Sequence, residues 1–300
     1  MQIKNNRSKY LQKSWIITLI KALLLAGCLF FIYSKLRNQT ISFIEMRPPE
    51  GFQLVLATVL ILMVINWYLE ALRWKALIGL FEPITIKEAW KTVLGGLALN
   101  WMLPFTSGDL IARISQQKDK YQATSAVIFS RGIMLGVTLI FGLYGMSFLT
   151  REYALNWWIF FGVIAGVLLL VLLFKNQIER FRSYFELLTK HLFLQVIAIS
   201  LLRYFVFTFQ FYLLLATFLP SLDAQVVIAG IGWVFLARSV LPLLFGGIGV
   251  REASGIFFFE PYHVEVQPII VPIFFIWIIN TVLPSLIGLI FIWRLKFVRK

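Results

Sequence analysis

The sequence predicts an all-α polytopic membrane protein with six transmembrane helices and two re-entrant helical hairpins, arranged as an inverted repeat. Three observations lead to this prediction. Of the 300 residues, 60% are hydrophobic and only 14% are charged, whereas a soluble domain carries roughly 25% charged residues. Several apolar runs exceed the roughly 18 residues that indicate a membrane helix. Two further apolar stretches are interrupted in the middle by proline and glycine.

Six apolar runs are near or above the ~20 residues that a transmembrane helix needs. They lie at 14–33, 52–80, 122–149, 155–174, 191–219 and 268–294. The first run contains Leu25-Ala26-Gly27-Cys28, which looks like a bacterial lipoprotein cleavage box, but the sequence stays apolar as far as Tyr33. Because a processed lipoprotein normally turns hydrophilic after its cysteine, we expect an uncleaved first helix.

The two interrupted stretches, 89–112 and 226–259, are expected to form the hairpins. Each is apolar but broken by Pro and Gly. Irregular backbone at membrane depth is tolerated only where protein covers it or where it lines a wet cavity. We therefore expect each stretch to enter and leave the membrane on the same side.

Basic residues predict the orientation. Lys and Arg are frequent before the first helix, near 73–91, 113–120 and 175–190, and in the C-terminal tail. The opposite connections carry fewer, namely Lys35, Arg37, Arg47 and Arg151. The positive-inside rule then places both termini in the cytoplasm, with the first hairpin entering from the cytoplasm and the second from outside. The same distribution accounts for the net charge of +14 without a nucleic-acid partner.

This topology divides a single membrane domain, 1–300, into two halves, 14–150 and 155–294, that begin on opposite sides. Counted from Pro104 and Pro242, the hairpins carry polar residues or glycine at matching positions, four before, four after and nine after the proline. The matching pairs are Asn100 and Arg238, Gly108 and Gly246, and Arg113 and Arg251. Inverted repeats with interrupted helices at the midplane are a transporter architecture.

Deep arginines are the strongest functional signal, because a charge at the centre of a membrane helix costs at least ~2.5–3.5 kcal/mol. The arginines expected in the spans or hairpins are Arg113, Arg131, Arg203, Arg238 and Arg251. The acidic residues at similar depth are Glu70, Asp109 and Glu252. A surplus of guanidinium groups suits a phosphate, which the planar arginine fork binds bidentately. The alternative is that these residues form structural ion pairs that lock the hairpins.

The segment Gly246-Gly247-Ile248-Gly249 after Pro242 is expected to adopt positive φ and to permit close approach of a ligand or a helix. A helix that starts after such a loop directs free N–H groups at an anion, although glycine also serves ordinary helix packing in membranes. Arg73 and Trp74, by contrast, are expected to anchor the second span at the cytoplasmic interface.

Catalytic and metal chemistry find little support in the sequence. His191 and His263 are predicted on opposite sides of the membrane, and the sequence has no His-Glu-x-x-His motif. Cys28 is the only cysteine, which excludes a disulfide framework and a cysteine-based metal site. We expect no enzyme activity, no cofactor and no metal.

Two motifs resemble a known family. They are Asn100-x-x-x-Pro104 followed by Gly108-Asp109-x-x-x-Arg113, and Pro242 followed by Gly246-Gly247-Ile248-Gly249-Val250-Arg251-Glu252. They are similar to the transmembrane region of lysylphosphatidylglycerol synthases, a flippase-type module that also occurs as stand-alone proteins, and Arg73-Trp74 fits the same family. In the two-domain synthases a soluble aminoacyltransferase follows the membrane region. This chain ends at Lys300, so we do not expect synthase activity.

The resemblance implies movement of an anionic phospholipid or a polyprenyl-phosphate-linked lipid between the leaflets of the bacterial cytoplasmic (inner) membrane. It places Arg113 and Arg251 at the headgroup phosphate or at hairpin closure, with Asp109 and Glu252 as their partners. A polar cavity at mid-depth is expected from Arg131, Arg203 and Arg238. The alternatives are a small-anion transporter and an accessory subunit that binds lipid or a glycosyltransferase. The expected partners are the lipid headgroup and the bilayer lipids, with a homo-oligomer or a membrane-enzyme complex left open.

Overall fold

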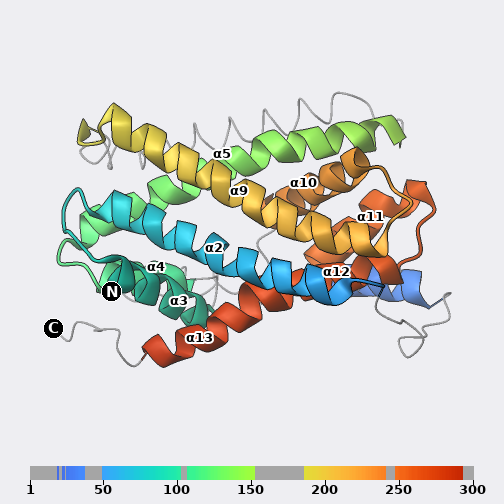
Figure 1. Ribbon diagram of the computed structural model, residues 1–300, viewed down its shortest axis with the longest axis horizontal. Coiled ribbons are helices and arrows are strands. Elements are labelled where there is room, and N and C mark those ends of the chain that lie inside the picture. Colours follow the sequence, from blue (N-terminus) through green and yellow to red (C-terminus); the bar gives the residue numbers. More distant parts are fainter. Residues whose placement is uncertain are drawn as a thin grey trace, which may run out of the picture.

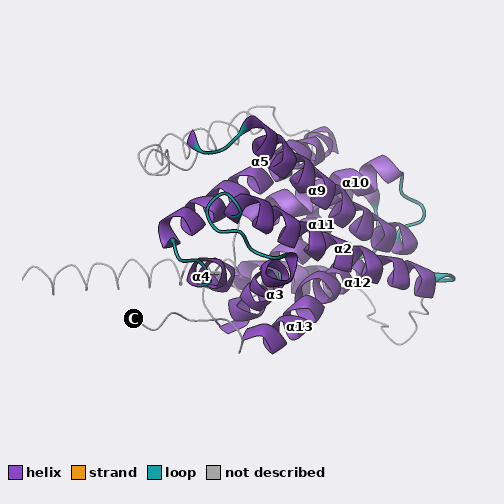
Figure 2. Ribbon diagram, turned by 60° about the vertical axis from the view of Figure 1, so that its left-hand side comes forward, coloured by secondary structure: helices purple, strands orange, loops and turns teal. Residues whose placement is uncertain are grey.

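The computed structural model describes residues 19, 22, 23, 25–37, 49–102, 107–152, 186–240 and 247–292. All regular elements in these residues are helices joined by loops (Figure 2). In chain order they are Leu25–Leu36, α2 (Phe52–Ile78), α3 (Ile86–Met102), α4 (Ser107–Ser115), α5 (Lys120–Glu152), α9 (Lys190–Phe218), α10 (Ala224–Val240), α11 (Val250–Phe259), the 3-10 helix η3 (Glu260–Tyr262), α12 (Gln267–Trp277), the π-helix η4 (Ile278–Val282) and α13 (Leu283–Ile292).

Four helical stretches are long and apolar enough to cross a membrane. They are Phe52–Ile78, Lys120–Leu149, Lys190–Phe218 and Gln267–Ile292. These stretches match the spans predicted at 52–80, 122–149, 191–219 and 268–294. The span predicted at 14–33 is described only in part, and the one at 155–174 lies outside the described residues. The count of six spans therefore stays a prediction.

The outer surface of the long helices is apolar, as a lipid-facing surface requires. Leu54, Ile61, Ile140, Leu202 and Ile290 are all exposed, and an apolar surface of this extent marks a protein that contacts a membrane or a partner. The interior is filled by aromatic and β-branched side chains. The largest fully buried ones include Trp74, Phe211, Ile231, Phe258 and Phe259.

Both interrupted stretches form pairs of packed helices, α3 with α4 and α10 with α11. The first pair is held close by Gly108, where an added Cβ would lie 2.3 Å from the carbonyl carbon of Leu99. The prolines Pro104 and Pro242 and the glycine Gly246 lie outside the described residues. The two pairs occupy opposite ends of the long axis of the molecule (Figure 1).

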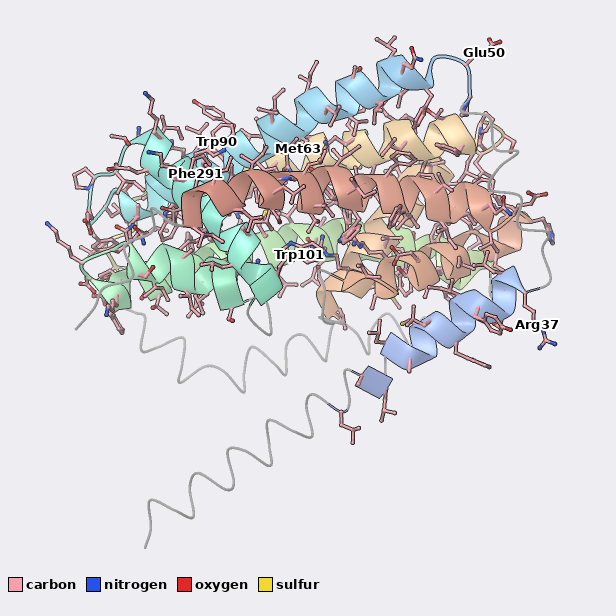
Figure 3. The ribbon with its side chains drawn as sticks, turned by 90° about the horizontal axis from the view of Figure 1, so that it is seen from below. Arg37, Glu50, Met63, Trp90, Trp101 and Phe291 are labelled. Carbon is pink, nitrogen blue, oxygen red and sulfur yellow. The ribbon has the colours of Figure 1, made fainter. Side chains whose placement is uncertain are left out.

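Each pair reaches from its end toward the middle. Trp101, near the end of α3, packs against Trp277 with ring centroids 5.9 Å apart, halfway along the helical stretch from α12 to α13. Figure 3 shows Trp101 near the middle of the long axis, between Arg37 at one end and Trp90 toward the other. On the second pair, Leu236 of α10 packs against Gly142 of α5, also far from either end of α5.

Candidate functional site

A network of buried charges is centred on Glu70 of α2, which is 3% exposed. Its Oε2 accepts hydrogen bonds from Arg73 Nη2 at 2.5 Å and from Arg203 Nη1 at 2.6 Å. Its Oε1 accepts one from Arg113 Nη2 at 2.6 Å. One carboxylate thus ties together α2, α4 and α9. We call the network the Glu70 cluster; its members are Asn66, Glu70, Arg73, Asp109, Arg113, Arg131, Ser200 and Arg203.

Further bonds stabilise the buried guanidinium groups, since a buried charge is tolerated only when it is paired and hydrogen-bonded. Arg113 Nε donates to Asp109 Oδ1 at 2.7 Å, one turn back on the same helix. Arg203 Nε donates to Asn66 Oδ1 at 3.1 Å, and Arg73 Nη1 donates to Ser200 Oγ at 3.1 Å. The predicted pairing of Arg113 with Asp109 is therefore present.

Two of the arginines also lie against tryptophan rings. The guanidinium of Arg113 lies 5.1 Å from the ring centre of Trp74, and that of Arg203 lies 5.5 Å from Trp67, within the range of a favourable cation–π contact. The expectation that Arg73 and Trp74 anchor the span at the membrane interface was wrong for their side chains. Both are buried in the protein, at 3% and 0% exposure, because Glu70, three residues before Arg73, draws it inward.

The cluster carries more positive than negative charge. Among the described residues, four arginines face two carboxylates. The outermost arginine is Arg131 of α5, whose side chain is 50% exposed and whose ion pair with Asp109 Oδ2 is long, at 3.4 Å. Arg131 is therefore the most accessible cation of the cluster, whereas Arg113 and Arg73 are buried.

The network continues through amides that the sequence did not single out. Asn66 Nδ2 donates to Asn280 Oδ1 at 3.3 Å. Asn280 lies in the π-helix η4, and its own Nδ2 is buried with no partner within the described ranges. Single π-turns inside longer helices are frequent at functional sites. The sequence signal that could have revealed Asn66 and Asn280 is the presence of an asparagine inside an apolar run. The signal that could have revealed the ion pair of Arg73 is its spacing of one helical turn from Glu70.

A second group of charges lies at the other hairpin. Arg238 is in the last turn of α10, and Arg251 and Glu252 are in the first turn of α11. Arg251 is 2% exposed, and its Nε and Nη2 have no hydrogen-bond partner in the part of the chain that the structure describes. Glu252, predicted as its partner, instead accepts a hydrogen bond from the backbone N–H of Gly249 at 2.7 Å.

The glycines of this hairpin have the conformation expected of them. Gly247 and Gly249 have φ of 86° and 88°, a region that glycine occupies without steric cost. A Cβ on Gly247 would lie 3.1 Å from Cγ of Arg238, so the arginine side chain runs directly over the turn. We call Arg238, Gly247, Gly249, Arg251 and Glu252 the α11 cluster.

The predicted site residues therefore fall into two groups. Arg113, Arg131 and Arg203 join the Glu70 cluster, and Asn100 supports it because its Oδ1 accepts a hydrogen bond from the backbone N–H of Asp109 at 3.0 Å. Arg238, which was expected to share a cavity with Arg131 and Arg203, has its described charged neighbours in the α11 cluster instead. Among the described residues, no group of three or more His, Cys, Asp or Glu side chains could hold a metal ion.

One comparison with known proteins identifies the family of this chain. No curated protein and no solved structure matches the chain. The family model described as the lysylphosphatidylglycerol synthase TM region matches residues 18–288. That range includes both helix pairs, the Glu70 cluster, the α11 cluster and three of the four long apolar helical stretches, and it covers the fourth, Gln267–Ile292, as far as residue 288. The chain is therefore a multi-pass membrane protein that belongs to the family of the lysylphosphatidylglycerol synthase transmembrane region.

Proposed function

We propose that this protein binds an anionic phospholipid or a polyprenyl-phosphate-linked lipid by its headgroup and moves it between the leaflets of the bacterial cytoplasmic membrane. The observation that carries the proposal is the Glu70 cluster, in which arginines outnumber carboxylates and Arg131 keeps half of its side chain exposed. Guanidinium groups of this kind bind phosphate through charge-assisted, bidentate hydrogen bonds. Headgroup binding and transfer require no covalent chemistry and no cofactor from this chain.

The position of the cluster supports a route across the membrane. Arg203 lies near the middle of α9, which spans Lys190–Phe218, and so about 20 Å from either end of that helix. Its side chain is 18% exposed. A headgroup that reached Arg203 would be near the bilayer midplane, where it would have left both polar surfaces.

The helix packing supports the inverted repeat and the re-entrant hairpins that such a route would use. Helix α2 packs against α9, its counterpart in the second half. Hairpin helix α3 packs against α13, and hairpin helix α10 packs against α5. Each hairpin thus contacts the last helix of the other half, as an exchange of equivalent elements about a two-fold axis would produce.

The distribution of lysines supports cytoplasmic termini. Lys75, Lys87, Lys118, Lys120 and Lys190 lie at the end of the molecule that holds the connections from α2 to α3 and from α4 to α5 (Figure 1). Lys35, Arg37 and Arg151 lie at the other end. The positive-inside rule assigns the lysine-rich end to the cytoplasm.

The test is leaflet exchange in proteoliposomes with fluorescent phosphatidylglycerol and phosphatidylcholine. We expect the wild-type protein to accelerate exchange of the anionic lipid and Arg131→Ala to reduce that acceleration at least tenfold. Arg131 makes one long ion pair and is half exposed, so its removal should leave the fold intact. Arg151→Ala, on the same helix and also exposed, is the matched control and should behave as wild type.

Two other outcomes would favour the alternatives. If folded protein exchanged no lipid, including a polyprenyl phosphate, it would act as an accessory subunit that binds lipid or a membrane enzyme. If the liposomes instead took up sulfate or phosphate in an Arg131-dependent manner, the protein would be a small-anion transporter.

A further inference from the structure

The buried guanidinium of Arg251 is the least satisfied charged group in the described residues. Its Nε and Nη2 are buried, without a partner among those residues, and the residue is 2% exposed. A charged group removed from water without hydrogen bonds is strongly unfavourable, and native proteins leave very few such donors. An unpartnered arginine in this position indicates a ligand that completes its hydrogen bonds.

The neighbours of Arg251 do not neutralise it. Glu252 is the one described carboxylate in electrostatic contact with it, and that carboxylate caps the backbone N–H of Gly249. Arg238 is the other charged neighbour and adds a second positive charge. The α11 cluster therefore carries a net positive charge in a buried place, and an anion would balance it.

The start of α11 adds donors of its own. The helix runs from Val250 to Phe259, and its N-cap is Gly249, which has no side chain to cap the first N–H groups. The backbone N–H groups of the first helical turn have no intrahelical partners. Together with the helix dipole they form a favourable position for an anion. The independent sign that this position is a binding site is the unpartnered guanidinium of Arg251 in that same turn.

The first hairpin contains an arginine at the position equivalent to Arg251, and that arginine is paired with a carboxylate. Arg113 and Arg251 both lie nine residues after their prolines, and Asp109 and Gly247 both lie five after. In the first hairpin Asp109 gives its carboxylate to Arg113 at 2.7 Å. In the second hairpin the corresponding residue is glycine, so the oxyanion is missing.

The residue four positions before each proline also differs between the hairpins, and again the second hairpin is the more positive. Asn100 accepts a hydrogen bond from the backbone of Asp109, five residues after Pro104. Arg238 lies over Gly247, five residues after Pro242. In both hairpins, the residue four positions before the proline contacts the residue five positions after it. These two residues are Asn and Asp in the first hairpin, and Arg and Gly in the second. The exchange removes a negative charge and adds a positive one at equivalent places.

We propose that the α11 cluster binds one phosphate group through Arg238, Arg251 and the backbone N–H groups at the N-terminus of α11. The phosphate oxygens would pair with Arg251 as the carboxylate of Asp109 pairs with Arg113 in the first hairpin. The phosphate is that of an anionic lipid headgroup or free inorganic phosphate. In the first hairpin the arginine is then neutralised by a carboxylate of the protein, and in the second it is neutralised by the bound phosphate. The choice of phosphate rests on the proposed function, but the site itself does not depend on transport.

The test is the thermal stability of the purified full chain in nonionic detergent, measured at constant ionic strength with inorganic phosphate, dihexanoyl phosphatidylglycerol or dihexanoyl phosphatidylcholine. We expect at least one phosphate compound to raise the Tm of the wild type by about 4 °C or more at saturation. Arg251→Gln should abolish the rise, and its Tm without ligand should equal or exceed that of the wild type, because the unpaired charge is gone. Arg151→Gln should respond as wild type.

A second pair of variants tests the internal comparison. Gly247→Asp supplies the carboxylate that Asp109 supplies in the first hairpin, and it should remove the response to phosphate. Gly247→Asn imposes the same side-chain size at the same positive φ without the charge and should keep the response. Aspartate and asparagine tolerate this backbone region better than other residues do.

The outcomes separate this site from the transport proposal. A larger rise with phosphatidylglycerol than with inorganic phosphate identifies a lipid headgroup, and the reverse identifies free phosphate. No rise with any compound, or equal rises in wild type and Arg251→Gln, would overturn the site while leaving Arg131-dependent lipid exchange untouched. A rise that requires Arg251 in a protein that exchanges no lipid would support the site and contradict the transport proposal.

Discussion

At the scale of single residues, Glu70 is the side chain on which most buried charge depends. It bonds three arginines, two of which have side chains that are at most 5% exposed. Glu70→Gln keeps the shape but removes the charge. Because breaking a buried ion pair from one side costs about 3–5 kcal/mol, we expect a large loss of stability, visible as a lower Tm in detergent. Glu50→Gln, on an exposed glutamate just before α2, should leave the Tm unchanged.

A double substitution tests whether the cost arises from the unpaired arginines. Arg203 donates to the same oxygen of Glu70 as Arg73 does. If Arg203→Gln is added to Glu70→Gln, one uncompensated cation disappears, so the double variant should be more stable than the sum of the single effects predicts. Additive effects would mean that the two residues are not coupled. The measurement is a double-mutant cycle on Tm or on the denaturant midpoint.

The sequence predicted the charged residues of the Glu70 cluster better than their partners. Arginines inside apolar runs are conspicuous, because each must have a reason to be there. Arg73 was misplaced because an Arg-Trp pair near the end of a span is also typical of an interface anchor. The contact between Asn66 and Asn280 joins residues 214 positions apart. Only the packing of the π-helix η4 against α2 brings the two asparagines together, and no local sequence pattern predicts that contact.

At the scale of helices, small residues set how closely the hairpins pack on the long helices. An added Cβ on Gly145 of α5 would lie 2.3 Å from the carbonyl oxygen of Ala229 on α10, whereas one on Gly136 of the same helix meets nothing within 4 Å. Gly145→Ala should therefore destabilise the protein by about 1–3 kcal/mol, as overpacking does. Gly136→Ala should leave it unchanged or stabilise it by up to about 1 kcal/mol through helix propensity.

Thermal unfolding of the two variants side by side checks this prediction. Since both replace glycine by alanine in one helix, differences in helix propensity largely cancel. Equal Tm values for the two variants would show that α10 does not depend on its close approach to α5.

The two helix pairs could be predicted as elements because proline and glycine interrupt two apolar stretches at 89–112 and 226–259, while their re-entrant course stays a prediction. The helices observed there, Ile86–Met102 with Ser107–Ser115 and Ala224–Val240 with Val250–Phe259, match those ranges closely. The π-helix between α12 and α13 could not be predicted. Its sequence, Ile278 to Val282, is as apolar as its flanks, and the wider turn depends on tertiary contacts such as the one that Asn280 makes with Asn66.

At the scale of the whole molecule, the two hairpins are alike in the order of their helices but differ in charge balance. The first is closed by an ion pair between Asp109 and Arg113 within α4. The second presents Arg251 without such a partner among the described residues. If the second hairpin binds an anion as we propose, the first hairpin would keep its conformation while the second would respond to the ligand. The difference in charge arises at a few equivalent positions, and it requires no change of fold.

The opposite placement of the hairpins makes a prediction about orientation in the membrane. Lys118 lies in the connection from α4 to α5, and Asp223 lies in the connection from α9 to α10; both are exposed and belong to opposite ends of the bundle. In a Cys28→Ser background, which removes the one native cysteine, Asp223→Cys should react with a membrane-impermeant maleimide in intact cells. Lys118→Cys should react only after the cells are permeabilised, if the lysine-rich end faces the cytoplasm as we propose.

The background variant without either new cysteine is the control and should remain unlabelled in both conditions. Labelling of both positions from outside would contradict an arrangement in which the hairpins enter from opposite sides. The reverse pattern, with Lys118→Cys labelled in intact cells and Asp223→Cys protected, would keep the inverted arrangement but turn the molecule over. In that case the Glu70 cluster, which lies between the middle of the bundle and the α3–α4 end, would be reached first from the outer leaflet, and an anionic headgroup would be taken up on that side.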